Sequence, residues 1–319
     1  MASPTTSAPA RGAAARGPGA RSSPTRIRRH APWTPYAFMA PFLVIFATFV
    51  LAPAVLGIWM SLHDWDFLLP SRPFVGLDNY TALFDSTSAV FEAFWHGMRA
   101  TAIFTVASVP FLVAIPLGLA VLLNRRFPGR TFFRAVFFMP YVLGVAVVGL
   151  LFRFILDPNI GIVNGLLGTS TPWITAQPWA WISLVAMTVW WTLGFNTIIY
   201  LAGLQDIPGE LYDAAKVDGA SAWQVFRHVT LPGLRTVHLF VVTITILASA
   251  NMFGQALLVT NGGPGDSTRT ALIVMLTEGL ESFRMGSAAA MSYLLAVFLG
   301  IVSIVQVLAM RERRPRWRS

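Results

Sequence analysis

Six long apolar stretches, separated by shorter polar segments, dominate the pattern of the chain. They lie near residues 36–60, 101–123, 132–156, 179–203, 237–258 and 287–309. Each is about 20 residues or longer, the length that a helix needs to cross the hydrocarbon core of a bilayer. The pattern predicts an all-α protein with six membrane-spanning helices. Pro110 and Pro116 lie inside the second stretch, where they predict a kink.

One polar segment, residues 210–232, has clear signals of local structure. Asp218-Gly219 is a turn signal, because glycine readily adopts the left-handed conformation that ends a helix. Ser221 and Gln224 have the spacing of a capping box at the start of a second helix. This helix places Trp223 and Phe226 on one face, and Pro232 ends it. The segment is therefore predicted to be a helix, a glycine turn and a second helix.

Composition supports a lipid environment for most of the chain. Hydrophobic residues make up 55% and charged residues 12% of the sequence, whereas soluble domains carry about 25% charged residues. The mean hydropathy is +0.63. The absence of cysteine excludes disulfide scaffolds, thiol catalysis and cysteine-ligated metals.

The net charge of +9 raises the question of nucleic-acid binding, but the positions of the charges argue against it. Most basic residues lie in residues 1–33, in the link between the second and third stretches, in or beside residues 210–232, and in residues 311–319. This distribution follows the positive-inside rule. It predicts that both termini and the polar segment are cytoplasmic, and it indicates no nucleic-acid partner.

No catalytic or metal-binding constellation is visible. Lys216 is not preceded by the glycine-rich loop of a phosphate-binding site, and HExxH is absent. The five histidines lack metal-ligand spacing. Asp64 and Asp66 are the only close carboxylate pair, and they are interpreted as solvated loop charges. We therefore expect no catalytic residue and no metal site.

The polar residues inside the stretches are uncharged, among them Asn196, Asn251 and Gln255. Such amides often form hydrogen bonds between helices. They also suit a path for a neutral, hydroxyl-rich solute, so both interpretations stay open for these three candidate path residues.

Three classes of function remain. A stand-alone secondary transporter or channel is one alternative, although ion-coupled transporters usually need an ionisable site within the membrane. A membrane-embedded enzyme is another, and it lacks a visible catalytic cluster. The third is a pore that receives force from a partner through the polar helix–turn–helix.

The residues of this segment resemble a known family. Asp213-Ala214-Ala215, three residues later Gly219-Ala220, and finally Leu231-Pro232 are similar to the EAA loop of permease subunits in binding-protein-dependent ABC importers. Asn261-Gly262-Gly263-Pro264 also resembles the sugar-importer branch of that family. Two positions depart from the family pattern, because Asp213 replaces the usual glutamate and Thr236 replaces a frequent proline.

The resemblance implies a type I ABC importer fold and a role in carbohydrate import. It implies a disordered cytoplasmic tail (1–33), a first span with an outer loop (34–97), a transmembrane core (98–310) with a cytoplasmic EAA loop (204–235), and a second tail (311–319). Residues expected to couple to an ATPase are Asp213, Ala214, Ala215, Asp218, Gly219, Ala220, Trp223, Phe226, Leu231 and Pro232.

The implied partners are a second, related permease subunit, two ATPase subunits and an extracytoplasmic solute-binding protein, together with membrane lipid. The resemblance implies that this chain binds no cofactor, and that ATP and magnesium bind to the partner ATPase. The expected location is the bacterial plasma membrane.

Overall fold

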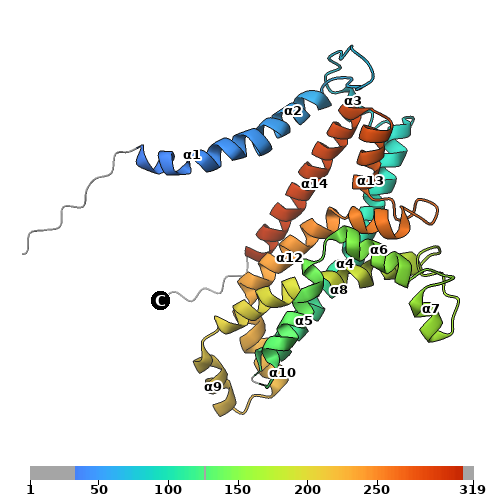
Figure 1. Cartoon of the computed structure of the whole chain (residues 1–319). Coiled ribbons are helices and arrows are strands. Elements are labelled where there is room, and N and C mark those ends of the chain that lie inside the picture. Colours follow the sequence, from blue (N-terminus) through green and yellow to red (C-terminus); the bar gives the residue numbers. More distant parts are fainter. Residues whose placement is uncertain (1–32, 126, 312–319) are drawn as a thin grey trace, which may run out of the picture. The chain divides into compact units, whose positions relative to one another are not determined.

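The computed structural model describes residues 33–125 and 127–311, and in these ranges it is built from helices (Figure 1). Two isolated bridges, His63 with Phe74 and Asp66 with Arg284, are the extended pairings in the described part. The predicted all-α class is confirmed. The helices are α1 (Thr34–Phe46), α2 (Ala52–Ser61), α3 (Asp78–Thr81), α4 (Ala89–Asn124), α5 (Arg130–Val142), α6 (Val145–Ile155), α7 (Ile162–Leu167), α8 (Trp179–Gln205), α9 (Gly209–Val217), α10 (Ala222–Val225), α11 (Leu231–Gly233), α12 (Arg235–Ala250), α13 (Ala271–Leu276) and α14 (Met285–Arg311), with π-helical segments η1 (Ala47–Leu51), η2 (Phe226–Thr230), η3 (Ala256–Thr260) and η4 (Thr277–Glu281).

Four described helices are long and apolar enough to cross a membrane: Phe38–Ser61, Ala89–Asn124, Trp179–Gln205 and Met285–Leu308. Two bent pairs raise the number to six when each counts as one span. They are Arg130–Val142 with Val145–Ile155, bent by 95°, and Ala222–Gly233 with Arg235–Ala250, bent by 72°. The prediction of a polytopic membrane protein with six spans is confirmed when each bent pair is counted as one span.

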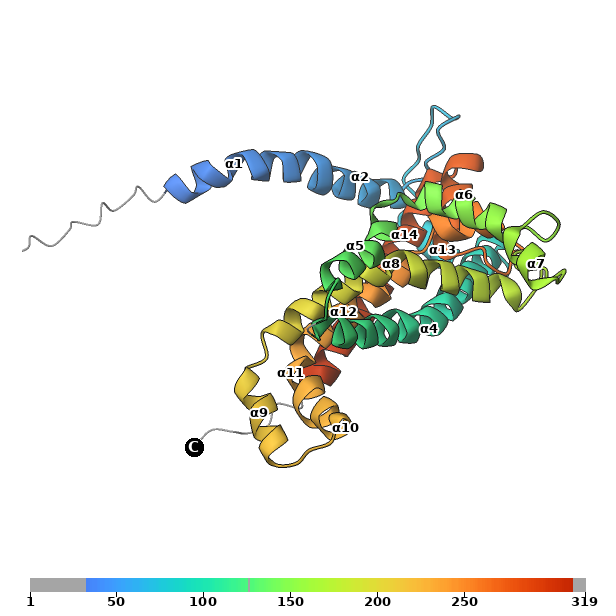
Figure 2. The same cartoon turned by 60° about the horizontal axis from the view of Figure 1, so that its bottom comes forward.

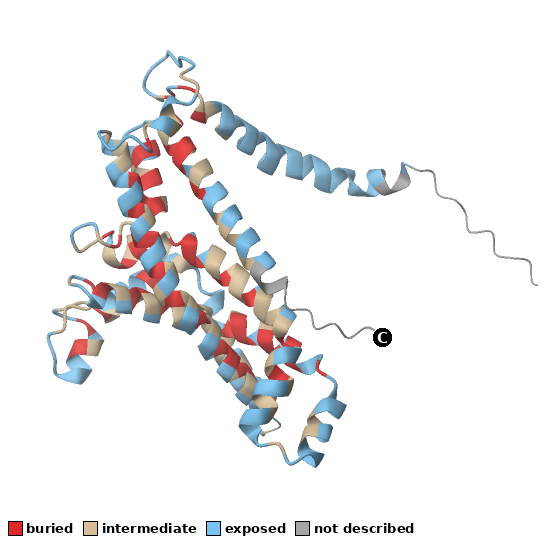
Figure 3. Ribbon diagram, turned by 180° about the vertical axis from the view of Figure 1, so that it is seen from behind, coloured by how far each residue is buried: buried red, intermediate tan, exposed pale blue. Residues whose placement is uncertain are grey.

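The chain divides into two compact units, Met1–Pro53 and Ala54–Ser319. In the first unit, the residues whose burial is described are all exposed, as the pale blue helix in Figure 3 shows. Its apolar side chains, Phe42 and Phe49 among them, suit lipid or another apolar surface. The predicted tails, 1–33 and 311–319, lie outside the described residues except for Trp33 and the backbone of Arg311. The predicted domain division stays a prediction.

In the second unit, α4 is the central helix. It packs against α8, α12 and α13, and Figure 2 shows α4 and α8 side by side. Phe104 on α4 and Met187 on α8 belong to one buried apolar cluster. Tyr200 and Leu234 belong to a second cluster, nearer to the polar segment that follows α8. These clusters fix α8 and α12 against α4.

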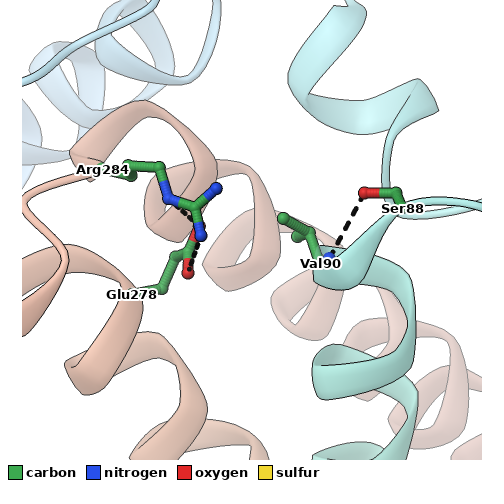
Figure 4. A network of polar contacts seen from close by, with 4 residues as sticks. All are labelled: Ser88, Val90, Glu278 and Arg284. Carbon is green, nitrogen blue, oxygen red and sulfur yellow. Dashed lines mark hydrogen bonds and ion pairs between the residues drawn. The ribbon is translucent and has the colours of Figure 1, made fainter.

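Helix α4 begins earlier than the sequence predicted. The expected start was residue 101, but the helix starts at Ala89, where the Ser88 hydroxyl accepts a hydrogen bond from the Val90 backbone N–H at 3.3 Å (Figure 4). Its first three turns were assigned to a loop because they carry Glu92, His96 and Arg99. These turns are helical nonetheless, since serine caps the N-terminus and Glu92 suits the first turn.

Helix α4 is continuous through Pro110 and Pro116. Proline at position 116 has no N–H for the carbonyl four residues earlier, that of Leu112. The Asn196 side chain of α8 donates to this Leu112 carbonyl at 2.9 Å. A neighbouring helix thus supplies the hydrogen bond that proline removes.

The third apolar stretch was predicted as one helix, and this is wrong. It is broken between α5 and α6, which meet at 95°. Pro140 lies in the last turn of α5, and Leu143 and Gly144 adopt extended conformations. The Trp191 indole N–H of α8 donates to the exposed Leu143 carbonyl at 3.0 Å, which satisfies a backbone group that the break releases.

The fifth stretch, predicted over residues 237–258, is also interrupted. Helix α12 ends at Ala250, residues 251–253 are not helical, and helical backbone resumes at Gly254 and continues into η3. Asn251 donates its side-chain amide to the Leu247 carbonyl at 2.8 Å, and Thr270 donates to the Met252 carbonyl at 2.9 Å. Thr270 thus gives the Met252 carbonyl a donor at the interruption, whereas the Leu247 carbonyl also accepts from the Asn251 backbone N–H at 3.1 Å.

An ion pair holds the segment before α14. The Arg284 Nε atom lies 3.0 Å from Oε1 of Glu278, six residues earlier in the chain (Figure 4). Glu278 is buried, and the Arg284 side chain is 53% exposed. This pair stabilises the chain reversal from η4 into α14.

Candidate coupling hairpin and translocation cavity

Residues 206–234 form a hairpin of two helical arms between α8 and α12, here called the coupling hairpin (Figure 1). Gly219 has φ +70 at the turn. The Ser221 hydroxyl accepts from the Gln224 backbone N–H at 3.4 Å, and the Gln224 side chain accepts from the Ser221 backbone N–H at 2.7 Å. The predicted glycine turn and capping box are confirmed.

The two arms enclose a hollow of about 430 Å³. It is lined mostly by small or apolar side chains, and Ala214, Ala215, Gly219 and Ala220 are among its walls. A Cβ atom on Gly219 would meet no atom within 4 Å. There is therefore open space beside Gly219 for a side chain.

The outer surface of the hairpin is apolar at several points. Val217 is 88% exposed, and Trp223 is exposed while its ring stacks on Phe226 with centroids 5.6 Å apart. Asp213 forms an exposed ion pair with Lys216 at 2.8 Å, an arrangement that contributes little stability. The other predicted coupling residues are also placed on this hairpin: Asp218 is exposed beside the turn, Leu231 is half-buried and Pro232 is exposed.

One polar contact lies within the hairpin, and another joins the two membrane helices that flank it. Within the hairpin, the hydroxyl groups of Tyr212 and Thr230 lie 3.3 Å apart. Above it, the buried Tyr200 hydroxyl of α8 lies 2.9 Å from Nδ1 of His238 on α12. The hairpin follows α8 and precedes α12 in the chain, and its Phe226 and Leu231 pack against the apolar cluster that contains Tyr200 and Leu234.

A cavity of about 520 Å³ lies within the second unit. It is lined by α4, α5, α6, α8, α12 and the non-helical segment after α12, and no charged side chain is among the lining residues. All three candidate path residues, Asn196, Asn251 and Gln255, line it. Both interrupted helices reach this cavity, through Val145 and through Asn251, Phe253, Gly254 and Gln255. Irregular backbone at membrane depth is tolerated where it lines such a cavity.

The three amides differ in how they are used. Asn196 is buried, and its Nδ2 atom donates to the Leu112 carbonyl and lies 3.4 Å from the Thr245 hydroxyl. Asn251 is exposed, and its side chain bonds only within its own helix among the described residues. The geometry therefore gives Asn196 the interhelical role and leaves Asn251 and Gln255 more available to a solute.

Sequence analysis missed the aromatic wall of the cavity. The rings of Tyr141 and Phe195 stack at 4.6 Å with planes 17° apart, and Trp191 lies 6.4 Å from Tyr141. All three line the cavity. Their mid-stretch positions, away from the ends where interfacial aromatics gather, were the available signal.

We expect Asn196→Ala to lower the melting temperature of the purified protein, because it leaves the buried Leu112 carbonyl without a donor. Hydrogen bonds between membrane helices contribute about 0.6–1.7 kcal/mol, so the shift should be a few degrees. Asn251→Ala and Gln255→Ala should melt like the wild type and alter the KM of uptake. An Asn196→Ala variant with unchanged melting and only altered uptake would reverse this assignment.

Comparisons with known proteins agree with this geometry. The family model of the binding-protein-dependent transport system inner membrane component matches residues 114–317. The arabinooligosaccharides transport system permease protein AraP of Bacillus subtilis is 34% identical, over 86% of this chain and 87% of that protein. The trehalose/maltose transport system permease protein MalF of Thermococcus litoralis is 31% identical, over 88% and 94%.

Among solved structures, a bacterial alginate ABC transporter in complex with a pentasaccharide-bound periplasmic protein is similar, with a TM-score of 0.71 and 25% identity over 89% of this chain and 94% of that one. The chain therefore belongs to the family of binding-protein-dependent transport system inner membrane components. It has the type I ABC importer transmembrane fold and is a membrane-embedded transport subunit.

Proposed function

We propose that this chain is one of two related permease subunits of an ATP-driven importer, and that its solute is a neutral carbohydrate. The observation that supports this proposal most directly is a cavity without charged side chains, lined by amides and aromatic rings, where two interrupted helices meet. The relatives named for arabinooligosaccharides and for trehalose and maltose support the same class of solute.

The cavity chemistry suits a sugar. Amide groups such as those of Asn251 and Gln255 exchange hydrogen bonds with hydroxyl groups without a charge penalty. The stacked rings of Tyr141 and Phe195 offer flat apolar surfaces to the C–H faces of a pyranose. A small number of polar groups in a mainly apolar pocket is typical of small-molecule sites.

The coupling hairpin is proposed to dock on one of two cytoplasmic ATPase subunits, which bind ATP and magnesium. Its exposed Trp223 and Val217 are suited to bury apolar surface in a groove of that partner. Closure of the ATPase pair would then move the hairpin as one body, because the capping box and the Tyr212–Thr230 contact hold its arms together. This movement reaches the cavity through α8 and α12.

We also propose an orientation of the chain in the membrane. The hairpin and both termini face the cytoplasm of a bacterial cell, in line with the distribution of basic residues. A solute-binding protein delivers the carbohydrate on the opposite side. Membership of the binding-protein-dependent transport family supports this partner.

The experiment uses the complete transporter with its binding protein in proteoliposomes. We expect ATP hydrolysis to rise when the binding protein is loaded with a neutral oligosaccharide. Trp223→Ala should lower both ATPase association and hydrolysis, whereas Leu280→Ala, a similarly exposed apolar residue in η4, should leave both unchanged. Equal hydrolysis in both variants would exclude the hairpin as the docking site.

A further inference from the structure

The loop between α6 and α8, residues 156–178, differs in charge from the other two connections at its end of the bundle. From Pro158 to Gln205 the sequence contains no Asp, Glu, Lys, Arg or His. Residues 62–88 contain Asp64, Asp66, Arg72, Asp78 and Asp85, and residues 261–284 contain Asp266, Arg269, Glu278, Glu281 and Arg284. The 156–178 loop is thus the connection without charged groups beyond Asp157.

This loop has a fixed internal structure organised by Asn164. Asn164 is buried, and its amide nitrogen donates to the carbonyls of Pro158 and Thr171 at 3.1 and 2.9 Å. Its amide oxygen accepts from the Trp173 indole at 2.8 Å and from the Thr169 hydroxyl at 3.1 Å. Because all four hydrogen-bonding positions of the amide are used, the side chain holds both ends of the loop together.

Asp157 fixes the entry to the loop. Its carboxylate accepts hydrogen bonds from the backbone N–H groups of Asn159 and Ile160 at 2.8 and 3.1 Å. The Asn159 and Ile160 hydrogen bonds hold the pKa of Asp157 below its usual value. The carboxylate is therefore committed to the backbone of the loop.

The same scaffold directs apolar side chains outward. Leu166 is 83% exposed, and Ile160, Ile162 and Leu167 are each more than half exposed. Helix α7 combines this exposed face with the buried Asn164, as the alternation of colours in Figure 3 shows. A rigid loop that exposes four branched apolar residues indicates an apolar partner.

The loop is continuous with exposed apolar surfaces of α6 and α8. Figures 1 and 2 both show α7 beyond the adjoining ends of α6 and α8. Exposed Phe154 near the end of α6 and Ile182 near the start of α8 extend the apolar surface along the chain. Trp173 and Trp179 pack edge to face, with centroids 5.0 Å apart, and tryptophan is enriched where a span meets the headgroups.

We propose that α7 and its flanking residues insert into the membrane interface, with lipid as the partner of the Ile160–Leu167 face. The face would sit about 5–10 Å below the headgroup surface, the depth typical of interfacial helices. Interfaces with soluble proteins have a polar, solvent-accessible rim, and the two charged connections, 62–88 and 261–284, are better suited to such a partner. This inference depends only on the membrane location of the chain, not on its solute.

The natural absence of cysteine makes a direct test possible. Leu166→Cys is labelled with an environment-sensitive fluorophore in the full chain, co-expressed with its partner subunits and reconstituted in phosphatidylcholine vesicles. We expect strong quenching by nitroxide-labelled lipids and severalfold weaker quenching by aqueous iodide than at Ser71→Cys. Ser71 is the matched control, because it is exposed and lies in the charged 62–88 segment.

A second variant, Ile162→Cys, guards against a local effect at position 166 and should give the same result. Two outcomes would overturn the proposal. One is iodide quenching at both positions equal to that at residue 71. The other is shielding that appears only after a binding protein is added, which would assign the face to protein docking.

Discussion

Gly219→Pro is expected to abolish ATP-driven uptake while the chain remains folded in the membrane. Proline fixes φ near −65°, whereas Gly219 has φ +70. The substitution also removes the N–H that donates to the Lys216 carbonyl at 3.1 Å. It places a proline after Asp218, which has the helical conformation that proline disfavours in its predecessor.

A graded series separates backbone strain from side-chain bulk. No atom lies within 4 Å of a Cβ placed on Gly219, so bulk alone is tolerated. Asparagine, which adopts the left-handed region at low cost, should keep most of the uptake, alanine should keep part of it, and proline should keep none. Gly209→Ala is the matched control, because Gly209 lies in the same hairpin with open space and no positive φ.

The series is read out by uptake and by co-purification of the ATPase. The membrane helices should be unaffected, since a side chain at position 219 enters open space. A Gly219→Pro variant that transports at the wild-type rate would remove the hairpin from the mechanism.

Gly194→Leu is expected to prevent the folded protein from accumulating. A Cβ atom at Gly194 would lie 2.3 Å from the Phe137 carbonyl oxygen and 2.4 Å from the Phe138 Cα. These are backbone atoms of α5, so no side-chain rotation relieves the clash. Small residues allow such close approach between membrane helices, and overpacking a well-packed contact costs about 1–3 kcal/mol or more.

The position also affects the cavity, since α5 carries Tyr141 and the next residue of α8, Phe195, forms the stack with it. Gly194→Ala should therefore lower the yield of monodisperse protein, and Gly194→Leu should lower it further. Gly118→Ala on α4 is the control, because a Cβ there meets nothing within 4 Å. Size-exclusion profiles and melting temperatures measure the effect. A Gly194→Leu variant with wild-type yield and melting would show that α5 and α8 are not packed this closely.

Local features were predictable from the sequence because their partners are close along the chain. Ser221 and Gln224 are three residues apart, and the Gly219 turn requires only its own backbone freedom. The apolar stretches predicted the spans for the same reason, since their length alone meets the requirement of the bilayer.

The breaks in the third and fifth stretches were not predictable in this way. The Leu143 carbonyl in the third stretch is satisfied by Trp191, and the Met252 carbonyl in the fifth stretch by Thr270. Both donors lie outside the stretch that they complete, 48 and 18 residues away in sequence. The hydropathy of a stretch depends only on its own residues. It carries no information on whether a backbone carbonyl receives a hydrogen bond from a side chain on another helix. The early start of α4 was not predicted, because Glu92, His96 and Arg99 make residues 89–100 as polar as a loop.

The candidate site was predicted in part. Asn196, Asn251 and Gln255 stood out as mid-stretch amides, but only the fold brings them to one cavity. The aromatic wall of Tyr141, Trp191 and Phe195 was not identified, because its role depends on the approach of α5 to α8. Whether these residues contact the solute stays a prediction, as does docking of the hairpin on an ATPase.

The central claim is that this chain passes a neutral carbohydrate only when an ATPase drives the coupling hairpin. The most direct measurement is uptake of labelled neutral oligosaccharides by proteoliposomes that contain the complete transporter. We predict that uptake requires ATP on the hairpin side and the loaded binding protein on the other, and that Gly219→Pro eliminates it. Uptake by this chain alone, at the same rate without ATP or the ATPase, would contradict the account and assign the protein to stand-alone transporters.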